Sequence, residues 1–197
     1  MQLFYDQRIT SLVQDKYIFL DNDFLSLLFT NEEAFREAYS CLAGSYFLLD
    51  SLTIFEFLRN IFVPKERKIR EKFLASSLGN TSVFFLATDH NDIYIKTREN
   101  ALILSKIYAH QGINGNKKSG GPGPIDLFLA AKLMIYSKRN HLLITGNKKD
   151  FPTVIFDTLS ILNIEDKNSG TMRCYSLVSF NQEKFDDCFE KLNDLKV

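Results

Sequence analysis

The segment Phe19-Leu20-Asp21-Asn22-Asp23 decides the fold that we expect for this chain. It ends an apolar run at residues 17–20, whose aromatic and β-branched side chains are typical of a buried strand. The run that follows, residues 24–29, has apolar side chains at helical spacing. The acidic residues therefore stand where a central strand passes into a helix. In an open α/β sheet, ligands bind at this carboxyl edge of the strands.

Strands and helices are predicted to alternate along the rest of the chain. We expect further strands at residues 46–49, 83–87, 141–145 and 172–180, with helices between them. Residues 154–162 fit either a strand or a helix. This alternation favours an α/β fold, a three-layer α/β/α sandwich with a central parallel sheet of four to five strands. Residues 112–124 hold five glycines and two prolines, which predicts a flexible loop or lid.

Length and composition favour one domain with an aromatic core. The chain has 197 residues, of which 45% are hydrophobic, and it contains 18 Phe and 8 Tyr but no Trp. We expect a single domain over residues 1–197, with its motifs in residues 17–152 and an extension, 153–197, packed on the same domain. The 24 basic and 24 acidic residues cancel, which argues against a protein coated in base for indiscriminate binding of nucleic acid.

The cysteine pattern and the N-terminus predict a cytoplasmic protein. Cys41, Cys174 and Cys188 are widely spaced and odd in number. This pattern argues for reduced thiols and against a zinc site or a disulfide framework. The N-terminus lacks the basic start and the apolar stretch of a signal peptide. The sequence has no run of about 18 apolar residues, so we expect no membrane span.

Four acidic residues occupy positions that a parallel sheet would bring to one edge. Asp21, Glu56 and Asp126 follow a predicted strand or begin a predicted helix, and Asp150 follows the strand at residues 141–145 by a short turn. Each acid alone has a simpler explanation, because carboxylates stabilise helix N-termini and are common in turns. Together they suggest a shared site, since the carboxyl ends of all parallel strands meet at the same edge of the sheet.

Carboxylates that converge in this way need a cation between them. Two carboxylates about 4 Å apart repel each other by about 4 kcal/mol at an effective dielectric constant of about 20. A cluster that lacks His and Cys suits hard divalent ions with oxygen ligands, so we expect Mg²⁺ or Mn²⁺ as the cofactor. Such ions bind phosphate oxygens, lower the pKa of a water molecule and stabilise in-line displacement.

Four segments, in order along the chain, resemble the motifs of the PIN domain family. Leu-Asp-Asn-Asp-Phe-Leu at residues 20–25 looks like the family's hydrophobic-Asp-Thr/Ser-Asn/Ser-hydrophobic-Leu opening. Ser-Leu-Thr-Ile-Phe-Glu-Phe at 51–57 is similar to Ser-x-Thr-x-x-Glu-Leu. Ile-Asp-Leu-Phe-Leu-Ala-Ala at 125–131 looks like Asp-x-hydrophobic-hydrophobic-Ala-Ala. Leu-Leu-Ile-Thr-Gly-Asn-Lys-Lys-Asp-Phe-Pro at 142–152 resembles the closing Leu-hydrophobic-Thr-x-Asn-x-x-Asp-Phe. Asp23 stands where the family often has Asn or Ser.

The resemblance implies a metal-dependent endoribonuclease that hydrolyses RNA phosphodiester bonds with a Mg²⁺- or Mn²⁺-activated water. It assigns catalysis and metal binding to four acids: Asp21, Glu56, Asp126 and Asp150. It assigns a supporting role to Thr145 and Asn147, which would orient water or the metal's ligands, and it leaves Asp23 as a further acid near the pocket. Toxins of VapBC toxin–antitoxin pairs belong to this family, so an antitoxin protein and a homodimer are candidate partners beside RNA.

Lysines near the predicted edge would suit an RNA backbone, because phosphate contacts dominate nucleic-acid affinity. They are Lys117, Lys118, Lys148 and Lys149. The same lysines could serve solubility alone. Two other functions stay open. One is a non-catalytic PIN-like module that binds RNA or a protein partner. The other is a nuclease or phosphatase for DNA or small phosphates, since carboxylates alone do not read the 2′-hydroxyl of RNA.

Overall fold

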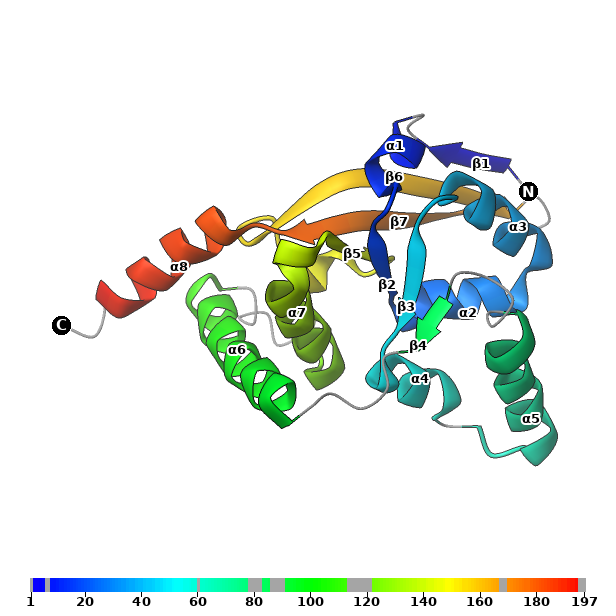
Figure 1. Ribbon diagram of the computed structural model, residues 1–197, viewed down its shortest axis with the longest axis horizontal. Coiled ribbons are helices and arrows are strands. Elements are labelled where there is room, and N and C mark those ends of the chain that lie inside the picture. Colours follow the sequence, from blue (N-terminus) through cyan, green and yellow to red (C-terminus); the bar gives the residue numbers. More distant parts are fainter. Residues whose placement is uncertain are drawn as a thin grey trace.

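A mixed β-sheet forms the centre of the computed structural model (Figure 1). The structure describes residues 2–5, 8–59, 61–77, 83–85, 91–112, 122–166 and 170–194. Within these residues the sheet has seven strands in the order β1-β6-β7-β5-β2-β3-β4. Their bounds are β1 Gln2–Tyr5, β2 Tyr17–Leu20, β3 Tyr46–Leu49, β4 Val83–Phe85, β5 His141–Thr145, β6 Phe156–Asp166 and β7 Thr171–Phe180.

One half of the described sheet is parallel, as the sequence predicts. In it β5, β2, β3 and β4 pair in parallel with their neighbours. Leu20 of β2 lies opposite Ile144 of β5. The next residues along each strand, Asp21 and Thr145, therefore lie side by side at the carboxyl edge. The predicted strand at residues 83–87 is confirmed for 83–85, and its last two residues lie outside the described part of the chain.

The other half of the sheet is antiparallel and extends the four-stranded parallel part that the sequence predicts. The strand β7 pairs with β5, β6 with β7, and β1 with β6, all in antiparallel fashion. The segment 154–162 is mostly strand, and its alternation shows why: Leu162 and Ile164 are buried whereas Ile161 is exposed. Residues 167–170 alone separate β6 from β7. So short a connection permits a hairpin, because parallel neighbours need a crossover of a dozen or more residues.

Helices cover both faces of the sheet, so the predicted three-layer α/β/α arrangement is confirmed (Figure 1). The helices are α1 Ile9–Val13, α2 Asn22–Thr30, α3 Glu32–Cys41, α4 Ser51–Leu58, α5 Pro64–Lys72, α6 Asn91–His110, α7 Pro124–Tyr136 and α8 Gln182–Asp194. A π-helical turn at Phe73–Ser77 and 3-10 turns at Ser137–Arg139 and Lys148–Asp150 also occur. Within the described part of the chain, no helix combines the length and apolar character that crossing a bilayer requires.

Side chains of the central strands alternate between two hydrophobic cores. Ile18 and Leu20 of β2 join the core that contains residues of α2, α3 and α4, whereas Phe19 joins the core that contains residues of α6 and α7. Burial on both faces explains why the strand reads as a continuous apolar run. Phe185 and Cys188 of α8 belong to the second core. The segment after residue 152 thus contributes to both the sheet and a core.

Side-chain capping fixes where two site-bearing helices begin. Asp21 is the N-cap of α2, and its Oδ1 accepts a hydrogen bond from the Asn22 backbone N–H at 2.7 Å. Asp126 lies in the first turn of α7 and accepts from the Gly123 backbone N–H at 2.8 Å. Such contacts satisfy backbone donors that lack partners inside the helix. Residues 113–121 of the predicted loop lie outside the described residues.

Candidate active site

Asp21 is a buried carboxyl group at the end of β2. It is 5% exposed, and its Oδ2 accepts a hydrogen bond from the Thr145 hydroxyl at 2.6 Å. Burial raises the pKa of Asp21 to about 7, and the nearby charges of Asp23 and Asp126 add to this effect. The hydrogen bonds from Thr145 and Asn22 oppose it. The folded environment therefore favours the protonated form of Asp21 more than water does.

Asp23 reaches from the first turn of α2 to the loop after β5. Its Oδ2 accepts a hydrogen bond from the Gly146 backbone N–H at 2.7 Å. Burial raises the pKa of Asp23, the Gly146 hydrogen bond opposes this, and the charges of Asp126 and Glu56 add to it. Its Oδ1 is buried and has no hydrogen-bond partner within the described residues. A Cβ at position 146 would lie 2.5 Å from Asp23 Oδ2, so this close approach requires glycine.

Asp150 and Asp126 form a carboxyl pair. Asp150 ends the 3-10 turn after β5 and is 5% exposed. Burial raises its pKa to about 6, and the charge of Asp126 and a hydrogen bond to the Asp126 side chain raise it further. The charge of Lys149 and a hydrogen bond from the Asn147 side-chain amide oppose the rise. Asp126 therefore lies close enough to Asp150 to act directly on its carboxyl group.

Glu56 lies on α4 at the rim of the cluster. Its side chain is 18% exposed and forms an ion pair with Arg59, with 2.9 Å between Oε1 and Nη2. Burial raises the pKa of Glu56, Arg59 opposes the rise, and Asp126 adds to it. Glu56 therefore lies within electrostatic reach of the other acids, while its direct partner is a cation on its own helix.

Asp126 is the common neighbour of the predicted acids. Its negative charge raises the pKa of four other carboxyl groups, those of Asp21, Asp23, Glu56 and Asp150. They come from the junction of β2 with α2, from α4 and from the turn after β5. The structure thus brings the sequence-predicted acids to one edge of the sheet, although they are far apart in the chain.

The acids nevertheless do not form a ready-made metal site. Among the residues that the structure describes, no group of three or more Asp, Glu, His or Cys side chains is arranged so that it could hold a metal ion. The hydrogen bonds explain this arrangement, because Asp21 is turned toward Thr145, Asp23 toward Gly146 and Asp126 toward Gly123. Cation binding at this edge would require some of these carboxylates to rotate.

Thr145 and Asn147 connect two of the acids. The Thr145 hydroxyl donates to Asp21 and accepts a hydrogen bond from the Asn147 backbone N–H at 2.9 Å. The Asn147 side-chain amide donates to Asp150. A continuous chain of hydrogen bonds therefore runs from Asp21 to Asp150. This arrangement restricts the orientation of both carboxyl groups.

The structure places one of the two predicted lysine pairs. Lys148 and Lys149 are exposed on the 3-10 turn that ends at Asp150, and the charge of Lys149 lowers the pKa of Asp150. Lys117 and Lys118 lie outside the described residues. A positive rim beside the acids is thus present at one place in the described part of the chain.

Sequence reasoning missed a buried ion pair beside the site. The Lys132 amine of α7 contacts the Asp50 carboxylate, and the two side chains are 3% and 1% exposed. Asp50 is also the N-cap of α4, where its Oδ1 accepts from the Leu52 backbone N–H at 2.8 Å. The pair therefore joins the helix of Glu56 to that of Asp126. Lys132 stands within the apolar stretch 125–136, and a lysine there signals a buried partner.

Comparisons with known proteins give a distant structural likeness. No family model matches the sequence. The comparison with curated proteins gives no match either. One similar solved structure is DNA-bound VapBC from Salmonella typhimurium. The match has 18% sequence identity and a TM-score of 0.46, and it covers 70% of this chain and 91% of the other. It is too distant to carry a function from that complex to this chain.

Proposed function

We propose that this chain is a cytoplasmic, metal-dependent endoribonuclease of the PIN type, which hydrolyses RNA phosphodiester bonds with a Mg²⁺- or Mn²⁺-activated water. The observation that carries the proposal is the position of Asp126, whose charge acts on four other carboxyl groups. These acids also occur in the order that the PIN resemblance implies. The proposal treats residues 1–197 as one domain, since β6, β7 and α8 join the sheet and core behind the acids.

The donor atoms at the site fit a hard divalent cation. In the described residues, the cluster offers carboxylate oxygens, the ligands that Mg²⁺ and Mn²⁺ prefer. The buried Asp23 Oδ1 lacks a partner within these residues, and a nearby cation would offset its burial. We assign Asp21, Asp126 and Asp150 as ligands and Glu56 as the acid that completes the pocket. When bound, such an ion lowers the pKa of a water molecule and stabilises the charge on the phosphate.

Neighbouring residues of the chain orient these acids and attract the substrate. Thr145 holds Asp21 and Asn147 holds Asp150 through the hydrogen bonds described above. Lys148 and Lys149 offer positive charge to the RNA backbone at the rim. We assign the same role to Lys117 and Lys118.

The decisive test is the variant Asp126→Asn, because an amide oxygen can still accept the hydrogen bond from Gly123 and keep the helix start. We expect RNA cleavage to fall by at least about 100-fold, the upper range for loss of groups that merely support a metal ligand. Asp187→Asn, an exposed acid on α8, is the matched control and should cleave normally. Undiminished cleavage by both Asp126→Asn and Asp21→Asn would overturn the proposal. Matched RNA and DNA oligonucleotides test the substrate class.

A second candidate is a non-catalytic PIN-like module that binds RNA or a protein partner. It is favoured by the absence of a three-donor metal group within the described residues. Titration calorimetry with Mn²⁺ separates the two candidates. Mn²⁺ binding that is lost in Asp126→Asn supports the nuclease. No Mn²⁺ binding, with RNA affinity retained in EDTA, supports the module.

A narrower form of the proposal is a VapC-type toxin that an antitoxin protein neutralises. Large apolar side chains on and after α4 are exposed, with Phe55 at 61%, Phe62 at 90% and Val63 at 56%. Such a surface suits a protein partner, whether an antitoxin or a second copy of the chain. Expression in a bacterial host should arrest growth, and Asp126→Asn should abolish the arrest. Light scattering of the purified chain tests for the homodimer.

A further inference from the structure

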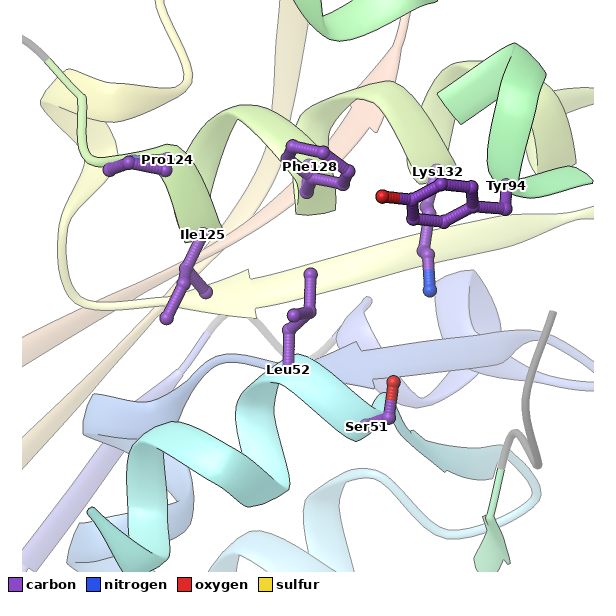
Figure 2. Close-up of a pocket in the computed structure, with 7 residues that line it drawn as sticks. All are labelled: Ser51, Leu52, Tyr94, Pro124, Ile125, Phe128 and Lys132. Atoms are coloured by element: carbon purple, nitrogen blue, oxygen red, sulfur yellow. The ribbon is translucent and has the colours of Figure 1, made fainter. Parts of the chain in front are cut away.

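A pocket of about 240 Å³ lies between α4, α6 and α7 (Figure 2). Leu52 lines it from α4 and Ile125 from α7. Leu52 stands one helical turn before Glu56, and Ile125 directly precedes Asp126. Residues four apart on a helix share a face, so the two helices that supply these acids also build the pocket. The pocket therefore lies one helical turn from Glu56 along α4 and next in sequence to Asp126 along α7.

Two aromatic rings give the pocket the character of a stacking site. Tyr94 of α6 is 52% exposed, and Phe128 of α7 is partly buried. Figure 2 shows both rings above Leu52 and Ser51 of α4. Aromatic rings bind unpaired bases by stacking, whatever the base. The volume lies below the roughly 300–1,000 Å³ of pockets that enclose drug-sized ligands, so it suits a single planar group.

One end of the pocket is polar. The Lys132 amine points from α7 toward α4 in Figure 2, and it is held there by the buried carboxylate of Asp50. The Ser51 hydroxyl lines the same pocket. Apolar walls with a fixed polar end match a nucleobase, which has apolar faces and a polar edge.

A cation adjoins the stacking site along α6. Arg98 is exposed and stands one helical turn after Tyr94. It lines a neighbouring pocket of about 210 Å³, which shares Phe128 and Pro124 with the first. An aromatic ring followed by a guanidinium group suits single-stranded nucleic acid, because the ring can stack on a base and the cation can contact a phosphate.

We propose that this pocket binds one unpaired RNA base next to the phosphate held at the acidic cluster, while Arg98 contacts a neighbouring phosphate. The inference rests on the proposed nuclease function, because the acidic cluster is what identifies the ligand as a phosphodiester. It adds a substrate requirement: the strand must be single or locally unpaired at the site of cleavage.

The first test measures the affinity of the full chain for a single-stranded RNA oligonucleotide in EDTA, where cleavage does not occur. Tyr94→Leu should weaken binding by about 5- to 160-fold, the range for loss of one stacked base. Tyr39→Leu is the matched control, since Tyr39 is similarly exposed, at 43%, but lies on α3 and lines a different pocket. This control should bind as the wild type does.

The second test separates the base contact from the phosphate contact. The slope of log affinity against log salt concentration should fall by about 0.7 in Arg98→Gln, because one phosphate contact to a single strand is lost. Tyr94→Leu should leave this slope unchanged. An RNA with an abasic nucleotide beside the cleaved bond should bind wild type and Tyr94→Leu equally weakly.

The outcomes distinguish failure of the pocket from failure of the proposed function. A wild type that cleaves RNA, with a Tyr94→Leu variant that binds RNA as tightly as Tyr39→Leu, would refute the pocket and leave the nuclease intact. A wild type that cleaves nothing, yet loses affinity through Tyr94→Leu, would refute the nuclease and support the pocket. Absence of any RNA binding by the wild type, in EDTA and equally in Ca²⁺, which would restore positive charge at the acids, would also overturn the inference. It would leave an apolar group of a protein partner as the occupant.

Discussion

Gly146 shows how a single residue without a side chain shapes the acidic cluster. A Cβ at this position would lie 2.5 Å from Asp23 Oδ2 and 3.2 Å from Tyr175 Cε1. We therefore expect Gly146→Ala to displace the Asp23 carboxylate and to lower the free energy of unfolding by about 1–3 kcal/mol, the usual cost of overpacking. Urea denaturation measures the change.

The Asp23 side chain, which the added methyl group would approach, can be removed as a control. In an Asp23→Ala background the carboxylate that the added methyl group would approach is absent. Gly146→Ala should therefore lower the free energy of unfolding by less than it does in the wild type. Equal costs in the two backgrounds would show that the contact between residue 146 and Asp23 does not determine the effect.

The Thr145 hydroxyl group opposes the rise in the pKa of Asp21 that burial and Asp23 cause. Its hydrogen bond lowers the pKa of Asp21, so Thr145→Val should raise that pKa further. The low-pH limb of the RNA-cleavage profile should then move to higher pH, and the free energy of unfolding should fall by about 1–3 kcal/mol. Thr145→Ser keeps the hydroxyl and should retain the wild-type profile. A shift of equal size in both variants would contradict this account.

The sequence predicts which acids gather at the sheet edge but not how they are hydrogen-bonded. Asp21 could be identified because it directly follows an apolar strand. The bond from Gly146 to Asp23 joins residues 123 positions apart, and it depends on the register that sets Leu20 against Ile144. Sequence periodicity does not specify that register, so the contact could not be predicted.

The ion pair of Lys132 and Asp50 ties two helices together. Lys132→Met would leave a buried carboxylate without its cation, and we expect a loss of about 3–5 kcal/mol in the free energy of unfolding. Asp50→Asn preserves the N-cap of α4 but removes the charge. The double variant should therefore cost less than the sum of the two single variants in chemical denaturation. Additive costs would mean that the pair contributes no interaction energy.

Secondary-structure elements were predictable where the local pattern was clear. The run at residues 17–20 and the fully buried β5 read directly as strands. The pairing of β7 was not predictable from its own residues, because strand direction depends on how the chain returns to the sheet. The short link between β6 and β7 determines that these two strands run antiparallel, because it is too short for a parallel crossover.

For the molecule as a whole, the raised pKa values predict that stability without metal falls as pH rises. The pKa values of Asp21, about 7, and Asp150, about 6, lie above the ordinary 3.8, so folding favours their protonated forms. This contribution is complete below about pH 4 and is lost as pH rises through the folded pKa values. In EDTA we expect the melting temperature to decrease between about pH 5 and about pH 8.

Added Mn²⁺ should reverse this trend. At about pH 8 the carboxylates are ionised and repel one another, so an ion that binds the folded state raises the melting temperature. At about pH 5 protons compete with the ion, and the increase should be smaller. A larger increase at the lower pH, or an equal one in Asp126→Asn, would argue against a metal site at these acids.

The pairing of β1 with β6 has a consequence for how the chain folds during its synthesis. Gln2 lies opposite Glu165, so β1 cannot find its partner until residue 165 has left the ribosome. Tyr17 of β2 lies opposite His141 of β5, so β2 can pair with β5 only after residue 141 has been synthesised. Pairings between such distant residues slow folding, because a long loop must close before any contact forms. The sheet edge that gathers the acids is therefore assembled late, and a nascent chain would lack the cluster until β5 has emerged.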